Sequence, residues 1–320
     1  MTTQNEVKND ERYKVLWNAG FVGLVEQMGS DETIEDSARV AYGRGTRKST
    51  ETRGLLRYLM KHKHSSPFEM GELRFHLKIP IFVMRQFVRH RTASLNEYSG
   101  RYSEMSDEMY LPEKWRKQSI SNKQGSSENF PDSEEAKKQG GNFGSGWCSC
   151  KICKKKYIGS SIIGLCADCL EDGPVTNQEL TADAKGITKD SYDVYESYVE
   201  RGVAKELARI VLPVANYTEL YWKIDLHNFF HFLKLRTDEH AQQEIRELAN
   251  AMLELAKPYF PISFEAWEDY EQNAVTLSRM EFELLKKMLC NIPFYLDSKP
   301  ESCSEREWKD FLNRWGIELS

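Results

Sequence analysis

The sequence predicts an α+β fold in which a sheet packs with helices, the C-terminal part is helical and a small zinc-ribbon-like module is inserted. Three observations lead to this prediction: an alternating stretch at 73–79, apolar positions at helical spacing in the last third, and two Cys-x-x-Cys pairs within 148–169. With 320 residues, the chain can form one large domain that carries an insertion.

Composition and charge exclude several classes of protein. Hydrophobic residues make up 40% of the chain, which indicates a globular protein rather than a disordered one. The 44 basic and 49 acidic residues give a formal charge of -5, so any anionic ligand must be bound by local arginine clusters. No stretch has the pattern of a signal peptide or a membrane span. We therefore expect no membrane association and a cytoplasmic location, or the cytoplasm of a host if the source is viral.

The N-terminal part predicts short apolar segments followed by two helices. Residues 13–28 form one or two apolar segments that are broken at 18–20. Helical spacing of apolar residues then covers 34–42 and 54–62, and Thr50 and Thr52 are possible N-caps of the second helix. Both helices are expected to face the core.

The clearest strand lies at 73–79, where Leu, Phe, Leu and Ile alternate with Arg, His and Lys. Pro80 ends the strand and can occupy the first turn of a helix that continues toward Arg89. The polar residues after this helix are better suited to a ligand than to a core.

The composition also predicts the domain organisation. Residues 118–146 are rich in Ser, Asn, Lys, Glu and Gly, which indicates a flexible insertion. We expect a discontinuous main domain at 1–117 and 188–290, an insertion at 118–187 and a C-terminal extension at 291–320.

Helical patterns return from about residue 192. One amphipathic face combines Val203, Leu207, Ile210 and Val211 before Pro213. Further helices are predicted at 245–255, at 280–289 and at 308–315, so we expect the C-terminal third to be mostly helical.

A dense polar cluster lies at 85–102. Its four arginines, Arg85, Arg89, Arg91 and Arg101, suit a phosphate or pyrophosphate, because guanidinium groups pair with such oxygens through two hydrogen bonds. Neighbouring Gln, Asn, Glu and Ser residues add directional donors and acceptors for a base and a ribose. The simpler alternative is a solvated basic helix end in which Glu97 is an internal salt-bridge partner.

The stretch RHRTASLNEYSGRY at 89–102 resembles the signature of the flavin-dependent thymidylate synthases. In that signature, Arg-His-Arg is followed after seven residues by Ser-x-Arg, here Ser99 and Arg101. Similar support comes from LMKHKHSSPFEM, PIFVMRQFVRHR, VAKELARIVLP and DLHNFFHFLKLRTDEHAQQEIR. The resemblance covers about 13–110 and 192–285.

The resemblance implies a role for individual residues. Arg236 corresponds to the arginine that polarises the uracil ring and is the predicted catalytic residue. The predicted dUMP contacts are Gln86, Phe87, Val88, Arg89, Glu97, Tyr98, Ser99, Gly100, Arg101, Arg209 and Arg236. The predicted FAD contacts are His64, Ser66, Arg89, His90, Arg91, Glu97, Asp225, His227 and His231. Without the resemblance, Arg209 could form a surface ion pair, Arg236 could stabilise a helix end, and His64 could be structural.

The same resemblance implies the reaction and its partners. FAD would carry hydride, NADPH would reduce the flavin, and methylenetetrahydrofolate would supply the carbon that converts dUMP to dTMP. A homotetramer with shared active sites is implied as well. The residues are consistent with this chemistry, because methylation at C5 needs either a thiolate or a hydride at C6, and no cysteine lies in the polar cluster.

Two Cys-x-x-Cys pairs predict a second site. Cys150, Cys153, Cys166 and Cys169 fit four thiolate ligands of a structural zinc ion. Cys148 could replace Cys150, and a redox dithiol is the alternative. A rival function is a zinc-containing protein that binds nucleic acid through the Arg-His-Arg cluster and the lysines at 151–156, although the acidic net charge argues against it.

Overall fold

The computed structural model describes residues 1–40, 51–120, 125–132, 135, 147–149, 156–158, 175–289, 303 and 305–315. The chain divides into two compact units: Met1–Met28 with Gly71–Pro258, and Gly29–Met70 with Tyr259–Ser320. Each unit is described by itself. None of the helices in the described ranges is long and apolar enough to cross a membrane.

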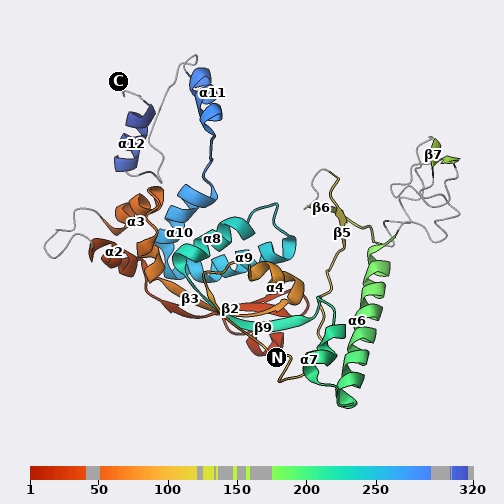
Figure 1. The fold of residues 1–320 in the computed structure, drawn as a ribbon. Helices are drawn as coiled ribbons and strands as arrows, with labels where there is room; N and C mark the ends of the chain where they lie inside the picture. The colour runs from red at the N-terminus through yellow and green to blue at the C-terminus, as the bar shows by residue number, and fades with distance from the viewer. Residues whose placement is uncertain are drawn as a thin grey trace. The chain divides into compact units, whose positions relative to one another are not determined.

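The first unit contains a five-stranded antiparallel sheet (Figure 1). In spatial order its strands are β1 (Tyr13–Leu16), β2 (Gly20–Met28), β3 (Glu72–Pro80), β9 (Tyr217–Asp225) and β4 (Ser94–Glu97). The predicted strand at 73–79 is β3, and the apolar stretch at 13–28, for which we expected one or two segments, forms β1 and β2. The fold class is thus α+β, as the sequence predicted.

One face of the sheet is apolar because side chains alternate along each strand. In the pairing of β3 with β9, Phe75 lies opposite Trp222 and Leu77 lies opposite Leu220. These four side chains are buried. The alternation that predicted β3 therefore places its apolar residues on the core face.

Three helices cover this apolar face: α4 (Ile81–Phe87), α8 (Leu226–Arg236) and α9 (Gln243–Ala256) (Figure 1). The Phe75 ring lies 5.3 Å from Phe229 of α8, and the Phe87 ring of α4 lies 4.4 Å from Trp222. Because aromatic side chains dominate core energetics, these contacts fix α8 relative to β3 and α4 relative to β9. The ends of α4 and α8 contribute to the candidate site described below.

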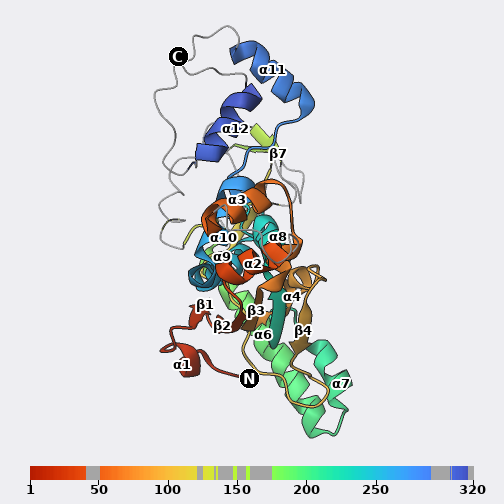
Figure 2. The same cartoon turned by 90° about the vertical axis from the view of Figure 1, so that its left-hand side faces the viewer.

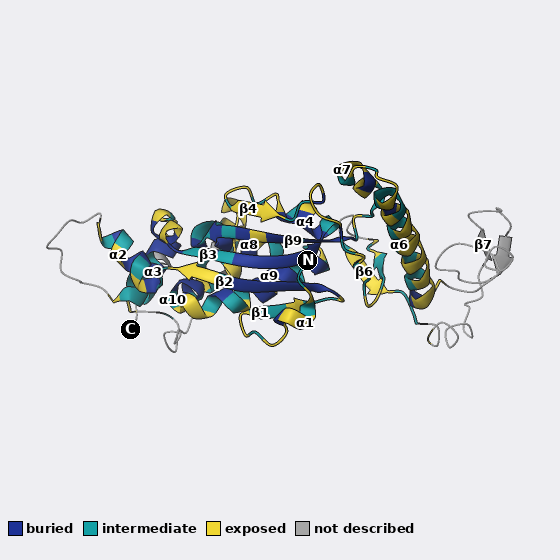
Figure 3. Ribbon diagram, turned by 90° about the horizontal axis from the view of Figure 1, so that it is seen from below, coloured by how far each residue is buried: buried dark blue, intermediate teal, exposed yellow. Residues whose placement is uncertain are grey.

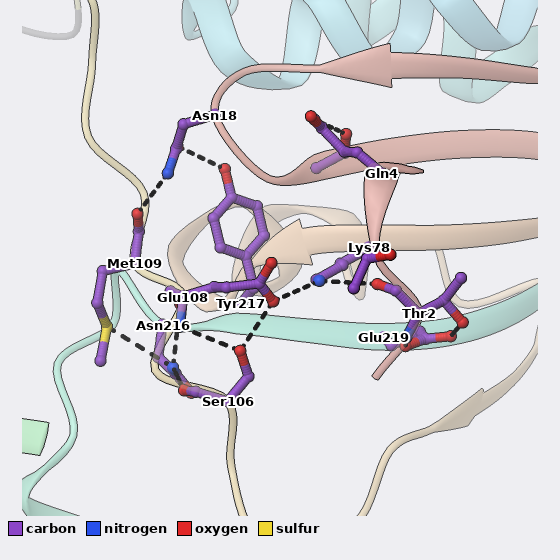
Figure 4. Close-up of polar contacts among 12 residues, drawn as sticks. Thr2, Gln4, Asn18, Lys78, Ser106, Glu108, Met109, Asn216, Tyr217 and Glu219 are labelled. Carbon is purple, nitrogen blue, oxygen red and sulfur yellow. Dashed lines mark hydrogen bonds and ion pairs between the residues drawn. The ribbon is translucent and has the colours of Figure 1, made fainter. Parts of the chain in front are cut away.

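Most residues of β3 and β9 are buried (Figure 3). The face opposite the helices carries a polar network (Figure 4). Lys78 is fully buried, and its Nζ donates to the Thr2 carbonyl (2.8 Å) and to the Glu108 carboxylate. The Glu219 carboxylate accepts hydrogen bonds from Thr2 N (2.7 Å) and Oγ1 and contacts His76 Nε2 at 2.7 Å. Burial acts to raise the pKa of Glu219, but the hydrogen bonds from His76 and Thr2 outweigh it and lower the pKa to about 2. The network thus ties the N-terminal segment to the sheet.

The first unit contains further helices and strands outside this sheet. The long helix α6 (Asn177–Glu200) begins with a capping box formed by Thr176 and Glu179. Helix α7 (Lys205–Ala208) lies beside it (Figure 1 and Figure 2). The elements are α1 (Gln4–Val7), β5 (Arg116–Gln118), β6 (Ser126–Asn129), β7 (Trp147–Ser149), β8 (Lys156–Ile158), α6 (Asn177–Glu200), α7 (Lys205–Ala208) and 3₁₀-helices Arg209–Val211 and Lys257–Tyr259, the last of which reaches the unit boundary.

The second unit is helical in its described part. Its elements are α2 (Asp31–Arg39), α3 (Thr52–Lys61), a 3₁₀-helix (Ser66–Met70), α10 (Pro261–Trp267), a π-helix (Glu268–Gln272), α11 (Arg279–Leu289) and α12 (Glu305–Trp315). Asp31 joins α2 to α10, because its carboxylate accepts hydrogen bonds from Ile262 N (2.7 Å) and from Ser263 N and Oγ (3.0 and 2.6 Å). Burial nevertheless raises the pKa of Asp31.

Several sequence expectations need correction. The N-cap of α3 is Glu51, and Thr52 is its first residue rather than its cap. Leu207 and Ile210, which we expected to share the apolar face of one amphipathic helix, are exposed, because that segment forms only a short α-helix and a 3₁₀ turn. The expectation of a mostly helical C-terminal third did not include β9, which lies inside the sheet.

Candidate functional site

The first unit contains a cleft of about 590 Å³ beside α4 and α8. Its walls come from residues that are far apart in the sequence. The lining residues are Arg85, Gln86, Arg89, His90, Arg91, Thr92, Ile224, Asn228, His231, Leu235 and Arg236.

One wall is formed by the end of α4 and the turn after it. Pro80 is the N-cap of this helix, and Phe87 in its last turn packs into the core. Because Phe87 fixes the helix from below, the following Arg89, His90 and Arg91 leave the core and line the cleft. Arg89 and Arg91 are exposed, and His90 is partly buried.

The other wall is formed by α8. Asp225 is the N-cap of this helix, and its carboxylate accepts hydrogen bonds from the Asn228 backbone (2.9 Å) and side chain (2.8 Å). Asn228, His231 and Leu235 follow one another at spacings of three and four residues, so they share one helix face and line the cleft together.

His90 and Arg236 join the two walls. Arg236 Nε donates to His90 Nε2 at 3.0 Å, and Arg236 Nη2 lies 3.4 Å from the Gln86 carbonyl. Burial first, and then the positive charge of Arg236, lower the pKa of His90 to about 4. Burial, followed by the charge of Arg89, also lowers the pKa of Arg236. The geometry therefore requires a neutral imidazole at position 90, with its proton on Nδ1.

The cleft concentrates positive charge without compensation. Within the described part of the chain, the side chains of Arg85, Arg89 and Arg91 have neither an ion pair nor a hydrogen bond. The lining also contains no Asp or Glu. Such free guanidinium groups fit the phosphates of a nucleotide or dinucleotide cofactor, because each can form two parallel hydrogen bonds to phosphate oxygens.

A second group of predicted residues begins at the last residue of β4 and continues after it. Glu97 accepts a hydrogen bond from the Thr218 hydroxyl at 2.7 Å, and Arg101 pairs with Glu206 of α7 at 3.1 Å. A Cβ atom at Gly100 would lie 3.2 Å from Arg209 Cδ, so the structure brings these two predicted residues together. The absence of a side chain at Gly100 thus permits a close approach of Arg209 to the backbone.

Some predicted site residues have side chains that are buried, bonded within the protein or outside the cleft. The Phe87 side chain is buried, so a ligand contact from this position would have to come from its backbone. The Tyr98 hydroxyl donates to the Glu104 carbonyl at 2.7 Å, and Asp225 caps α8. The partly buried His227 and the exposed Val88 do not line the cleft.

The structure also adds residues that the sequence did not single out. Thr92, Asn228 and Leu235 line the cleft. The spacing of Asn228 and Leu235 from His231 was the available signal, because a residue on one helix face implicates its neighbours at three and four positions.

His64 and Ser66 lie in the second unit. His64 follows α3, and Ser66 begins the next 3₁₀-helix. The backbone between them and α3 turns through Lys63, whose φ of 59° is in the left-handed region. The end of α3 holds His64, whose backbone N donates to the Leu59 carbonyl at 2.9 Å.

The predicted zinc ligands Cys150, Cys153, Cys166 and Cys169 lie outside the described residues. In the part of the chain that the structure describes, no group of three or more His, Cys, Asp and Glu residues is arranged to hold a metal ion.

Comparisons with known proteins identify the family. The family model described as "Thymidylate synthase complementing protein" matches residues 23–262. The flavin-dependent thymidylate synthase of Wolbachia pipientis wMel is 38% identical over 305 residues, which are 95% of this chain and 92% of that protein. The chain belongs to the flavin-dependent thymidylate synthase family. Proteins with the same description from Thermus thermophilus and Dictyostelium discoideum are each 42% identical, over 84% and 83% of this chain and 83% and 77% of their own lengths.

Solved structures agree with this family assignment. The structure of a UMP/dUMP methylase, PolB from Streptomyces cacaoi, bound with 5-Br dUMP has a TM-score of 0.59 and 28% identity, and covers 81% of this chain and 99% of that one. The same methylase bound with 5-Br UMP has a TM-score of 0.57. These comparisons support an enzyme and give no support to the nucleic-acid-binding alternative.

Proposed function

We propose that this chain is a flavin-dependent thymidylate synthase that methylates dUMP to dTMP. The observation that carries the proposal is the cleft, in which Arg85, Arg89 and Arg91 lie beside Arg236 and no carboxylate among the described residues compensates their guanidinium groups. Both FAD and dUMP carry phosphate groups that such a cleft attracts. The family membership supports this pair of ligands over other phosphate compounds.

The cleft residues fit the flavin cofactor. Arg89 and Arg91 would pair with its phosphates, and His231 and Asn228 offer further hydrogen-bonding groups from α8. We also propose that His90 lies against the cofactor. The proposed flavin contacts outside this cleft are His64, Ser66, Glu97, Asp225 and His227.

The residues after β4 fit the nucleotide substrate. Ser99 and Gly100 offer backbone groups at a point where Arg209 comes close to the chain, and Arg101 lies in the same turn. We propose that these residues bind dUMP together with Gln86, Arg89, Glu97 and Arg236, and that the backbone of 87–88 and Tyr98 complete the site.

Arg236 is the proposed catalytic residue. When bound, the reduced flavin supplies hydride and methylenetetrahydrofolate supplies the carbon for the methyl group. The Arg236 guanidinium would stabilise the negative charge that develops on the pyrimidine ring, which is an electrostatic contribution. His90 would hold this guanidinium in place through the 3.0 Å hydrogen bond.

The proposal includes partners that the sequence resemblance implies. NADPH would serve as the reductant, and four copies of the chain would share active sites. The zinc-ribbon-like insertion would hold one structural zinc ion through its four cysteines. We further propose that the enzyme works in the cytoplasm.

The test is release of tritium from dUMP labelled at C5, measured with flavin, methylenetetrahydrofolate and NADPH present. The purified protein should carry a yellow flavin and release tritium. Arg236→Ala should keep the flavin and lose about two to three orders of magnitude in turnover, as expected for loss of a group that stabilises developing charge. Arg12→Ala removes an exposed arginine that pairs with Asp10 and is the matched control. Turnover by Arg236→Ala at the wild-type rate would refute the assignment.

A further inference from the structure

The C-terminal helix α12 docks on α3 through three neighbouring pairs of side chains. Arg57 Nε donates to Glu307 Oε1 at 2.8 Å, and Lys61 pairs with Asp310 at 3.3 Å. The third pair is the Arg306 guanidinium, which lies 4.8 Å from the centre of the Tyr58 ring. The residues on each helix follow the spacing i, i+1, i+4, so one face of α12 matches one face of α3.

Arg57 anchors this contact. Its side chain is only 5% exposed, and it also pairs with Glu265 at 2.8 Å and with Asp269 at 2.7 Å. A buried guanidinium is costly unless its charge is compensated, so Glu307 has a fixed position among these carboxylates. The Glu307 carboxylate additionally accepts a hydrogen bond from the Tyr270 hydroxyl. The anchor therefore sets where the neighbouring Arg306 lies.

Tyr58 also contacts the two histidines that follow α3. Its ring lies 4.3 Å from the His62 ring at 41° and 6.0 Å from the His64 ring at 78°. The His62 and His64 rings are themselves 6.5 Å apart. Tyr58 is thus the side chain that both histidines and Arg306 contact.

The backbone after α3 leaves His64 little freedom. His62 N donates to the Tyr58 carbonyl at 3.0 Å, and His64 N donates to the Leu59 carbonyl at 2.9 Å. Lys63 between them is in the left-handed conformation, and its ammonium pairs with Glu271 of the π-helix. Because the backbone is fixed, the direction of the His64 ring depends on the side chain that packs against it.

The groups that hold the end of α3 lie outside the matched family segment, which ends at residue 262. Arg306, Glu307, Asp310 and Glu271 all follow that point in the chain. We propose that Tyr58 is a positioning residue for His64 and that Arg306 of α12 holds the Tyr58 ring in place. This inference rests on the proposed role of His64 in flavin binding. Helix α12 thereby contributes to flavin binding through Tyr58 and His64.

The experiment measures the rate at which the holoenzyme releases its flavin after dilution. Release is detected as the recovery of flavin fluorescence. Arg306→Ala and Tyr58→Leu should each speed release about two- to fivefold, as expected for loss of a cation–π contact or of the packed ring. Arg306→Lys and Tyr58→Phe keep the cation and the ring, so both should release flavin at nearly the wild-type rate. Arg279→Ala is the matched control, because Arg279 is an exposed arginine of α11 that pairs with Glu283.

A double-mutant cycle distinguishes positioning from a general loss of stability. If Arg306 acts through His64, Arg306→Ala should not speed release further in a His64→Ala background. If Arg306→Ala speeds flavin release as much in the His64→Ala background as in the wild type, the proposal is overturned. It is also overturned if His64→Ala speeds flavin release and Arg306→Ala alone releases flavin at the wild-type rate. Wild-type release by His64→Ala would overturn the His64 assignment and this inference with it. Tritium release by the same His64→Ala protein would still report on the proposed enzyme function.

Discussion

Replacement of His90 tests whether the cleft depends on a neutral imidazole. His90→Gln keeps an uncharged group that can accept the hydrogen bond from Arg236, whereas His90→Lys places a permanent cation beside that guanidinium. A lost hydrogen bond to a charged group costs about 1.5–3 kcal/mol, so tritium release by His90→Lys should fall by about ten- to a hundredfold. His90→Gln should retain activity within about tenfold of the wild type.

The lowered pKa of His90 also makes stability depend on pH. The pKa of His90 is about 4 in the folded protein, below its ordinary value of 6.5, so the unfolded chain binds more protons between these values. The free energy of unfolding should therefore fall as pH decreases from 6.5 toward 4. From these two pKa values, the free energy of unfolding should fall by at most about 2 kcal/mol between pH 7 and pH 5. Solvent screening of this partly exposed ring reduces the expected fall to about 1 kcal/mol.

The assay is equilibrium denaturation in urea at pH 7 and pH 5, for the wild type and for His90→Gln. The wild type should lose about 1 kcal/mol more than the variant on acidification. His240→Gln, which removes an exposed histidine that contacts Asp238, is the matched control. Two results would refute the reasoning: equal losses for the wild type and His90→Gln, or a His90 resonance that titrates near pH 6.5 in NMR spectra.

Three further changes test other parts of the molecule. The double variant Arg89→Ala/Arg91→Ala should purify with much less flavin, because phosphate charge would be left unpaired, and full flavin occupancy by absorbance would contradict the phosphate assignment. Lys78→Met should lower the free energy of unfolding by about 2 kcal/mol, because the buried contact to Glu108 is lost; an unchanged urea midpoint would contradict this. Cys166→Ser should reduce the proposed content of about one zinc per chain while flavin remains bound, and retention of the metal in elemental analysis would exclude this ligand.

The sequence predicted β3 but not its neighbour β9, for a physical reason. In β3, charged residues alternate regularly with apolar ones, and this gives a clear period of two. In β9, Tyr221 stands next to Trp222, so bulky aromatic side chains point to both faces and blur the period. The strand also pairs with β3 and β4, which lie more than a hundred positions earlier, and a local pattern carries no information about such pairing.

The candidate site was predictable in part. The arginines after α4 stand close together in the sequence, so their charge indicated an anionic ligand before the fold was known. The contact between His90 and Arg236 joins residues 146 positions apart, and the short helix that carries Arg209 packs beside Gly100 only in the folded chain. The resemblance to a family indicated these residues, while residue spacing alone gave no reason to group them.

The unpaired guanidinium groups of the cleft have a cost when no anion is present. Arg89 repels Arg236, and Arg85 and Arg91 add positive charge to the same concave site, where solvent screens repulsion only partly. A ligand that binds only the folded chain adds stability in proportion to the logarithm of its concentration over its dissociation constant. Newly made chains should therefore survive proteolysis longer in cells that are well supplied with flavin. The amount of this protein in a cell would then follow the vitamin status of that cell, even at a constant rate of synthesis.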